Sequence, residues 1–140
     1  MSQKRLSIKT LLIFLMVTVS SVAGTTPENA AQKAAESWLA YIDSAQYGES
    51  WDQASELFRS RIEKGQWVKT ITAVRSSLGK VQSRKLKNAT FMTSLPGAPD
   101  GKYVVIQFDT SFAKKKSGVE TITPMEEEGG QWRVSGYFIR

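Results

Sequence analysis

The spacing of apolar residues changes partway along the chain, and this change constrains the fold more than any other feature. From Lys80 onward apolar and polar residues alternate, which is the period of a β-strand with one buried face. Breaks containing glycine and proline interrupt the alternation and predict turns. We therefore expect an antiparallel meander of four strands, at about residues 81–95, 102–112, 119–125 and 131–140.

Several positions predict the details of this sheet. The alternation fails near residues 85–88, where we expect a β-bulge or a strong bend. Pro124 lacks an N–H group, so it predicts an edge position or an irregularity in the third strand. Gly129-Gly130 predicts the last tight turn. Asp109 has the opposite parity to the apolar residues of the second strand and should face solvent; those residues are Val104, Ile106, Phe108 and Phe112.

Before Lys80 the apolar residues recur at helical spacing. Thr26 followed by Pro27 predicts a helix start, and Gly79 predicts the cap that ends the last helix. If Gly48 and Gly65 are breaks, three helices follow, at about residues 26–48, 49–65 and 66–78. Three N-terminal helices packed on a curved four-stranded antiparallel meander define an α+β fold.

The N-terminus has the pattern of a secretory signal. Lys4, Arg5 and Lys9 precede an apolar-rich run at residues 11–19, and small residues follow at 21–24. We predict a signal peptide at residues 1–23 and a single domain at residues 24–140, exported to the periplasm or the extracellular space. The alternative is an uncleaved signal that tethers the protein to the inner membrane. Cleavage removes three of the 19 basic residues and none of the 13 acidic ones, so the net charge falls from +6 to +3.

Composition excludes several kinds of site. The chain contains no histidine and no cysteine, which removes the commonest general base, thiol nucleophiles, disulfides and nearly every zinc or haem site. We therefore predict no metal site and no cofactor. The low net charge after cleavage and the lack of a reader motif also predict that the protein does not bind nucleic acid.

Spaced motifs over residues 34–140 carry a family resemblance. They are Trp51-Asp52-Gln53-Ala54-Ser55, Trp67 with Arg75 and Leu78-Gly79, Leu95-Pro96-Gly97 with Pro99-Asp100-Gly101, Glu120-Thr121-Ile122-Thr123, and Trp132-Arg133-Val134-Ser135-Gly136-Tyr137. Together they resemble domain of unknown function 4019, a family of small exported bacterial proteins. The order of helices and strands also resembles the nuclear-transport-factor-like, or cystatin-like, cone. That fold hosts both enzymes and binding modules, so the resemblance implies no reaction.

The sequence assigns no catalytic residue. An enzyme of this fold needs a carboxylate or a tyrosine inside the cone, together with a hydrogen-bond donor for the developing charge. Asp109 is the only acid that we place within the apolar part of a strand, and its parity directs it to solvent. Asp52 lies near the start of the expected second helix, where an acid is favoured by the helix dipole.

Aromatic residues and one arginine are the candidate ligand contacts. The aromatic residues that would line a pocket for an apolar ligand are Trp51, Trp67 and Tyr137, together with Trp38, Trp132 and Phe58. Arg75 would reach the mouth of the cone as an anion contact. The alternative is that the aromatic residues form the core, since each buries about 150–250 Å². Arg75 would then lay its aliphatic stem over the third helix.

The register of the meander predicts a charge asymmetry along the sheet. A basic cluster should gather at one end of the sheet: Arg84, Lys85, Lys87, Lys114, Lys115, Lys116 and Arg140. The opposite end should carry Asp100 and residues 126–128, which are all glutamates. Such a surface would contact anionic lipid or another polyanion. The alternative is that lysines on edges and turns keep the sheet soluble.

Taken together, these patterns predict an exported, non-catalytic envelope protein that binds a small ligand or an envelope protein. A small isomerase- or hydrolase-like enzyme of the same fold is one alternative. A dimerising module is the other, in which Tyr103, Val105 and Ile139 lie outside the core and a homodimer forms through the outer face of the sheet.

Overall fold

The computed structural model describes residues 24–140, and the predicted signal peptide at 1–23 lies outside the described residues. Four helices precede four strands: α1 (Pro27–Asp43), α2 (Tyr47–Asp52), α3 (Glu56–Arg61), α4 (Lys64–Leu78), β1 (Val81–Met92), β2 (Tyr103–Phe112), β3 (Lys115–Glu126) and β4 (Trp132–Ile139). The α+β class is therefore confirmed, with four helices in place of three. No helix among residues 24–140 has the length and apolar character needed to cross a bilayer.

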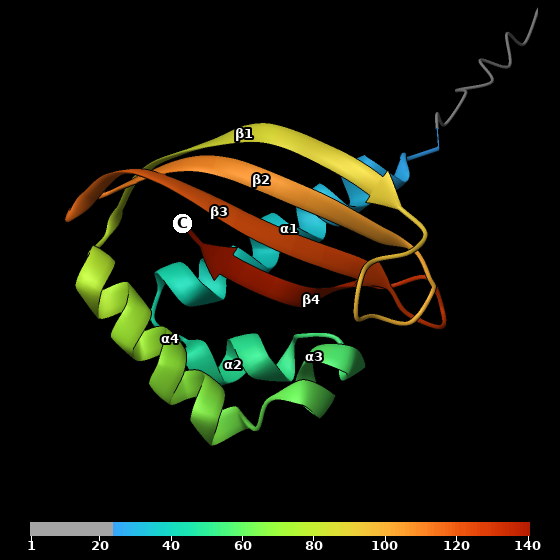
Figure 1. Ribbon diagram of the computed structural model, residues 1–140, viewed down its shortest axis with the longest axis horizontal. Helices are drawn as coiled ribbons and strands as arrows, with labels where there is room; N and C mark the ends of the chain where they lie inside the picture. The colour runs from blue at the N-terminus through green and yellow to red at the C-terminus, as the bar shows by residue number, and fades with distance from the viewer. Residues whose placement is uncertain (1–23) are drawn as a thin grey trace, which may run out of the picture.

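The strands form one antiparallel meander in the order β1-β2-β3-β4 (Figure 1). The register of β1 against β2 shifts between Leu86 and Asn88, which confirms the expected bulge. The pairing of β3 with β4 shifts between Thr123 and Pro124, so the predicted irregularity is confirmed. The edge position is wrong for Pro124, because β3 is a central strand.

The helix boundaries differ from the glycine-based prediction. Helix α1 ends at Asp43, where the Ser44 N–H bonds back to the Ala40 carbonyl and Ala45 takes a positive φ of 59°. Gly48 and Gly65 both lie within helices rather than between them. The expected second helix divides at Ser55, whose hydroxyl caps α3 and whose N–H bonds to the carbonyl of Val134. A tertiary contact with β4 therefore sets this break.

The helix caps at the two ends of the helical region follow the sequence. The Thr26 hydroxyl accepts a hydrogen bond from the Asn29 N–H, at 3.2 Å, with Pro27 in the first turn. Gly79 ends α4 with a φ of 76°, and its N–H bonds to the Arg75 carbonyl at 2.9 Å. Both predicted caps are thus confirmed.

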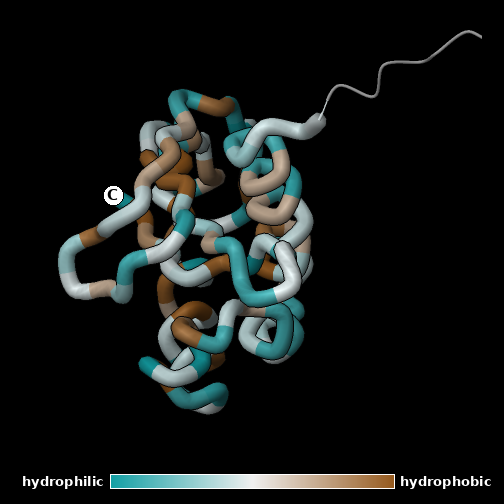
Figure 2. Tube along the Cα trace, turned by 90° about the vertical axis from the view of Figure 1, so that its right-hand side faces the viewer, coloured by the Kyte–Doolittle hydropathy of each residue, from teal (hydrophilic) through white to brown (hydrophobic). Residues whose placement is uncertain are grey.

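Helix α1 crosses the inner face of the sheet, while α2, α3 and α4 lie together beyond the β4 edge (Figures 1 and 2). The second strand confirms the predicted parity, because Val104, Ile106 and Phe108 are buried and Asp109 is exposed. The core lies between α1, the other helices and this inner face. We call the space between the helices and the sheet the interior of the fold. It is the place where the sequence analysis expects a ligand pocket.

Candidate functional site

A buried carboxylate lies at the centre of the inner face. Glu120 of β3 has 0% of its surface exposed. Its Oε1 accepts hydrogen bonds from Arg84 Nε at 2.7 Å and from Thr110 Oγ1 at 2.5 Å, and its Oε2 accepts from Arg84 Nη2 at 3.2 Å. The Tyr137 hydroxyl donates a further hydrogen bond to Oε2. Four protein donors therefore satisfy the acceptor capacity of this carboxylate.

The same network extends to the end of α1. Arg84 donates to both carboxylate oxygens of Asp43, at 2.7 and 3.1 Å, and Arg75 Nη1 donates to Asp43 Oδ1 at 3.1 Å. Burial raises the pKa of the Asp43 carboxyl, but the hydrogen bonds and charges of Arg84 and Arg75 outweigh it, so the net pKa is lowered. Burial likewise opposes the charge of Arg84, yet its bonds to Asp43 and Glu120 raise the pKa of its guanidinium.

This network corrects two of the predicted site residues. Arg84 does not belong to the basic surface, because it pairs with Thr110 across the sheet and its guanidinium binds Asp43 and Glu120. The sequence pattern places Arg84 opposite about Lys114, beside the β2–β3 turn, whereas in the structure Arg84 pairs with Thr110, farther from that turn. Arg75 is 7% exposed, with its guanidinium carbon 5.4 Å from the Phe112 ring centroid, so it is neither a free anion contact nor a surface residue.

The sequence analysis did not predict the two carboxylates of this network, Glu120 and Asp43. The third strand was expected at residues 119–125, so Glu120 would lie near its beginning, where a side chain is often exposed. In the structure β3 begins at Lys115, so Glu120 lies well inside the strand. Glu120 shares its parity with the buried Ile122 and Pro124, and that spacing was the available signal. Asp43 follows the buried Leu39 by four residues on α1, which places both on one helix face.

The closed hydrogen bonding of Glu120 favours a structural role over catalysis. A general base must reach a substrate proton, but Arg84, Thr110 and Tyr137 already occupy the Glu120 oxygens. Neither of the two cavities described below includes Glu120, Tyr137 or Arg84 in its lining. The network instead connects α1 to α4 and, through Arg84, Thr110, Glu120 and Tyr137, to all four strands, which fixes the helix across the sheet.

The ionisation of Tyr137 tests whether the Glu120 network is buried. Burial and the charge of Glu120 raise the pKa of its hydroxyl above the ordinary value of about 10. Since the folded state then holds the proton more tightly than the unfolded state, stability should fall as the pH rises above about 10. A phenolate titration at 295 nm, compared between wild type and Tyr137→Phe, should show Tyr137 ionising only with unfolding. Ionisation of Tyr137 near pH 10 in the folded protein would contradict the buried network.

The interior of the fold is filled by aromatic side chains. Trp38, Phe58 and Trp67 contact one another with ring centroids 4.9–6.3 Å apart, and Tyr137 lies 5.4 Å from Trp38. Trp67 is 6% exposed and its indole N–H bonds to Ser50 Oγ at 2.9 Å. Trp51 packs against this core and donates to the Ile62 carbonyl at 2.8 Å. The geometry thus places three predicted pocket residues, Trp51, Trp67 and Tyr137, in the packing of the core.

An open groove lies instead between α1 and the beginning of β4. Its volume is about 430 Å³, within the range of small-molecule sites. The lining consists of Ala30, Lys33, Ala34, Ser37, Trp38, Tyr41, Gln53, Gln131, Trp132, Arg133 and Val134. A second, larger hollow of about 770 Å³ adjoins it and shares Gln53, Gln131 and Arg133. We call the first of these the α1–β4 groove.

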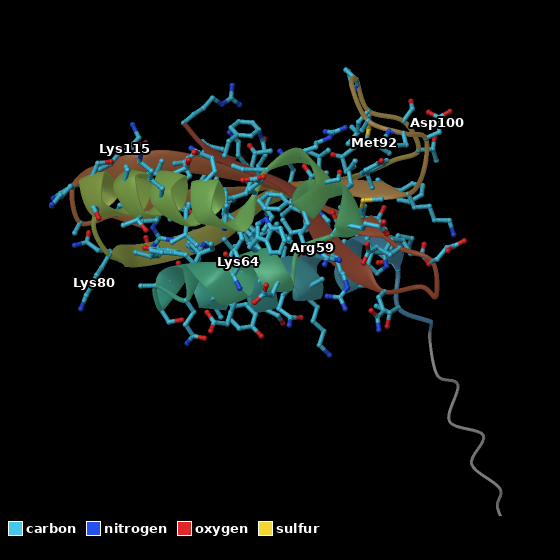
Figure 3. The ribbon with its side chains drawn as sticks, turned by 90° about the horizontal axis from the view of Figure 1, so that it is seen from below. Arg59, Lys64, Lys80, Met92, Asp100 and Lys115 are labelled. Atoms are coloured by element: carbon cyan, nitrogen blue, oxygen red, sulfur yellow. The ribbon has the colours of Figure 1, made fainter. Side chains whose placement is uncertain are left out.

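Most of the predicted basic cluster does lie at one end of the sheet. Lys114, Lys115 and Lys116 are exposed at the β2–β3 turn, and Arg140 bonds through its backbone to Val119 nearby. Lys85 and Lys87 lie farther along the β1 edge. Figure 3 shows Lys80 and Lys115 at this end, with Met92 and Asp100 at the other. The contact of this surface with an anionic lipid or a polyanion stays a prediction.

The outer face of the sheet carries a mixed surface. Tyr103 is 1% exposed, because the β1–β2 connection covers it and its hydroxyl donates to the Pro99 carbonyl at 2.6 Å. Phe138 is 52% exposed. On β1 and β2, Asn88 donates to Gln107 at 3.2 Å across the strands. Tyr103 therefore offers no surface for the predicted dimer, whereas Phe138 does.

The family model described as "Protein of unknown function (DUF4019)" matches residues 34–137. No curated protein matches the chain. Among residues 24–140 there is also no group of three or more acidic side chains arranged to hold a metal ion.

Proposed function

The chain belongs to the DUF4019 family of proteins of unknown function, and we propose that it is an exported, non-catalytic protein that binds a small ligand in the α1–β4 groove. Export is supported by the signal pattern of residues 1–23. The groove carries the proposal because it is an open concave site with aromatic and polar lining, while the interior is filled by packed side chains.

Trp132 is the residue on which this binding depends most directly. It begins β4, is half-buried, and belongs to the groove lining as well as to the edge of the core. A half-buried indole that faces an open groove retains apolar surface for a ligand to cover. Lys33, Tyr41 and Ser37 face the same space from α1, so a ligand would bridge the helix and the strand.

Native mass spectrometry of the protein purified from its own envelope fraction tests the proposal. We expect a monomer that carries a reproducible small-molecule adduct, and we expect Trp132→Ala to lose that adduct while remaining folded. Trp51→Phe is the matched control, because Trp51 contacts the core without lining the groove. An adduct that survives in Trp132→Ala but is lost in Trp51→Phe would place the ligand elsewhere.

The dimer is the second candidate, because Phe138 leaves an exposed aromatic ring on the outer face of the sheet. The same spectra distinguish it. A dimer without an adduct, converted to a monomer by Phe138→Ser, would replace groove binding by assembly as the leading function.

A further inference from the structure

The polar groups that line the α1–β4 groove act mainly as hydrogen-bond donors. Arg133 Nη1 lies 3.4 Å from Gln53 Oε1, and Arg133 Nη2 donates to Gln131 Oε1 at 3.0 Å. Because a guanidinium only donates hydrogen bonds, both amide oxygens must face Arg133. The NH₂ groups of Gln53 and Gln131 are therefore turned away from it, and within residues 24–140 neither donates to another protein group.

The charged residues that line the groove also favour an anionic ligand. Its lining contains Lys33 and Arg133 and no acidic residue. Arg133 Nε is 3.0 Å from Glu127 Oε1, but Glu127 belongs to the neighbouring hollow. Lys33 is exposed on α1 and takes part in none of the ion pairs formed within residues 24–140. Its charge is thus the one in the lining that an anionic ligand would neutralise.

The apolar part of the groove is lined by small side chains on the α1 side and by aromatic rings, chiefly that of Trp132 of β4. Ala30, Ala34 and Ser37 recur at intervals of four and three on α1, so their small side chains form one stripe of the helix surface. Trp132 faces this stripe from β4, and Tyr41 continues it by one more turn. A ring system or an acyl chain would lie on the small residues and contact the indole.

From these features, and resting on the proposed function, we infer that the ligand is a small amphiphilic anion. Its apolar body lies between the α1 stripe and Trp132, and its carboxylate, sulfonate or phosphate group accepts hydrogen bonds from the groove amides and is neutralised by Lys33. A neutral ligand would gain no attraction from Lys33, and a cationic ligand would be repelled by it.

Two fluorescent probes of nearly the same shape test this inference. 1-Anilinonaphthalene-8-sulfonate carries a sulfonate, and N-phenyl-1-naphthylamine is its neutral counterpart. Titration of the purified full protein should give a one-to-one complex with the sulfonate that is at least about tenfold tighter than the neutral complex. Lys33→Gln should weaken the sulfonate complex by about three- to tenfold and leave the neutral complex unchanged. Lys69→Gln, an exposed lysine on α4, is the control and should change neither.

The outcomes separate the inference from the proposed function. Equal affinity for both probes, lost in Trp132→Ala, would overturn the anionic class while supporting ligand binding in the groove. Binding of both probes that is unaffected by Trp132→Ala would overturn the groove itself. A sulfonate preference that is lost in Lys33→Gln, together with loss of both complexes in Trp132→Ala, supports the inference.

Discussion

Replacing Arg84 with methionine is expected to destabilise the fold by about 3–5 kcal/mol, as is typical when one partner of a buried ion pair is removed. The substitution leaves Glu120 fully buried and without the cation that donates to both of its oxygens. Thr110 and Tyr137 would still donate to it, but neither carries a positive charge. Urea unfolding followed by circular dichroism gives the free energy of unfolding directly.

The exposed pair between Lys64 and Asp52 provides the matched control. These side chains are each almost half exposed and 2.9 Å apart, so Lys64→Met should cost no more than about 1 kcal/mol. Replacing Arg84 and Glu120 together by apolar residues should recover much of the loss, because no unpaired charge then remains buried. If Arg84→Met costs no more than Lys64→Met, the network does not hold α1 on the sheet.

The second large effect is expected for Trp67→Ala, at about 3–5 kcal/mol. Trp67 packs edge-to-face on Phe58 at 4.9 Å and against Trp38 at 6.0 Å, so truncation leaves a cavity and also removes the indole N–H that donates to the Ser50 hydroxyl. Trp67→Phe should lose less, because it keeps most of the contacts. The same unfolding measurement applies to both variants.

Val74→Ala on the same helix is the control for this effect. Val74 is 36% exposed, and its truncation should cost well under 1 kcal/mol, as for surface substitutions generally. A loss below about 1 kcal/mol for Trp67→Ala as well would mean that the interior is loosely filled. The interior would then become a competing ligand site, and the argument for the α1–β4 groove would weaken.

Sequence patterns predicted the parts of the fold that depend on local chemistry. The caps at Thr26 and Gly79 follow from a hydroxyl acceptor and from a residue that tolerates positive φ. The faces of β2 follow from strict alternation. The division between α2 and α3 was not predictable in this way, because Ser55 bonds to Val134, far along the chain in β4.

The candidate site was harder to predict because it depends on how distant elements meet. Trp132 of β4 and Ala30 of α1 line one groove although most of the chain separates them. Among the aromatic residues considered from the sequence, Trp51, Trp67 and Tyr137 pack in or against the core without lining the groove, whereas Trp132 does line it. Glu120 was not predicted because the third strand was expected to begin at residue 119, so Glu120 lay at its end and its shared parity with Ile122 was not used.

The indole N–H signals of the four tryptophans test the central claim most directly. They can be followed by ¹H–¹⁵N correlation NMR while 1-anilinonaphthalene-8-sulfonate is added, with single Trp→Phe variants for assignment. Binding in the α1–β4 groove predicts a large, saturable shift of the Trp132 signal and little change at Trp51 and Trp67. Shifts at Trp51 and Trp67 with an unmoved Trp132 would place the ligand in the interior and contradict the account.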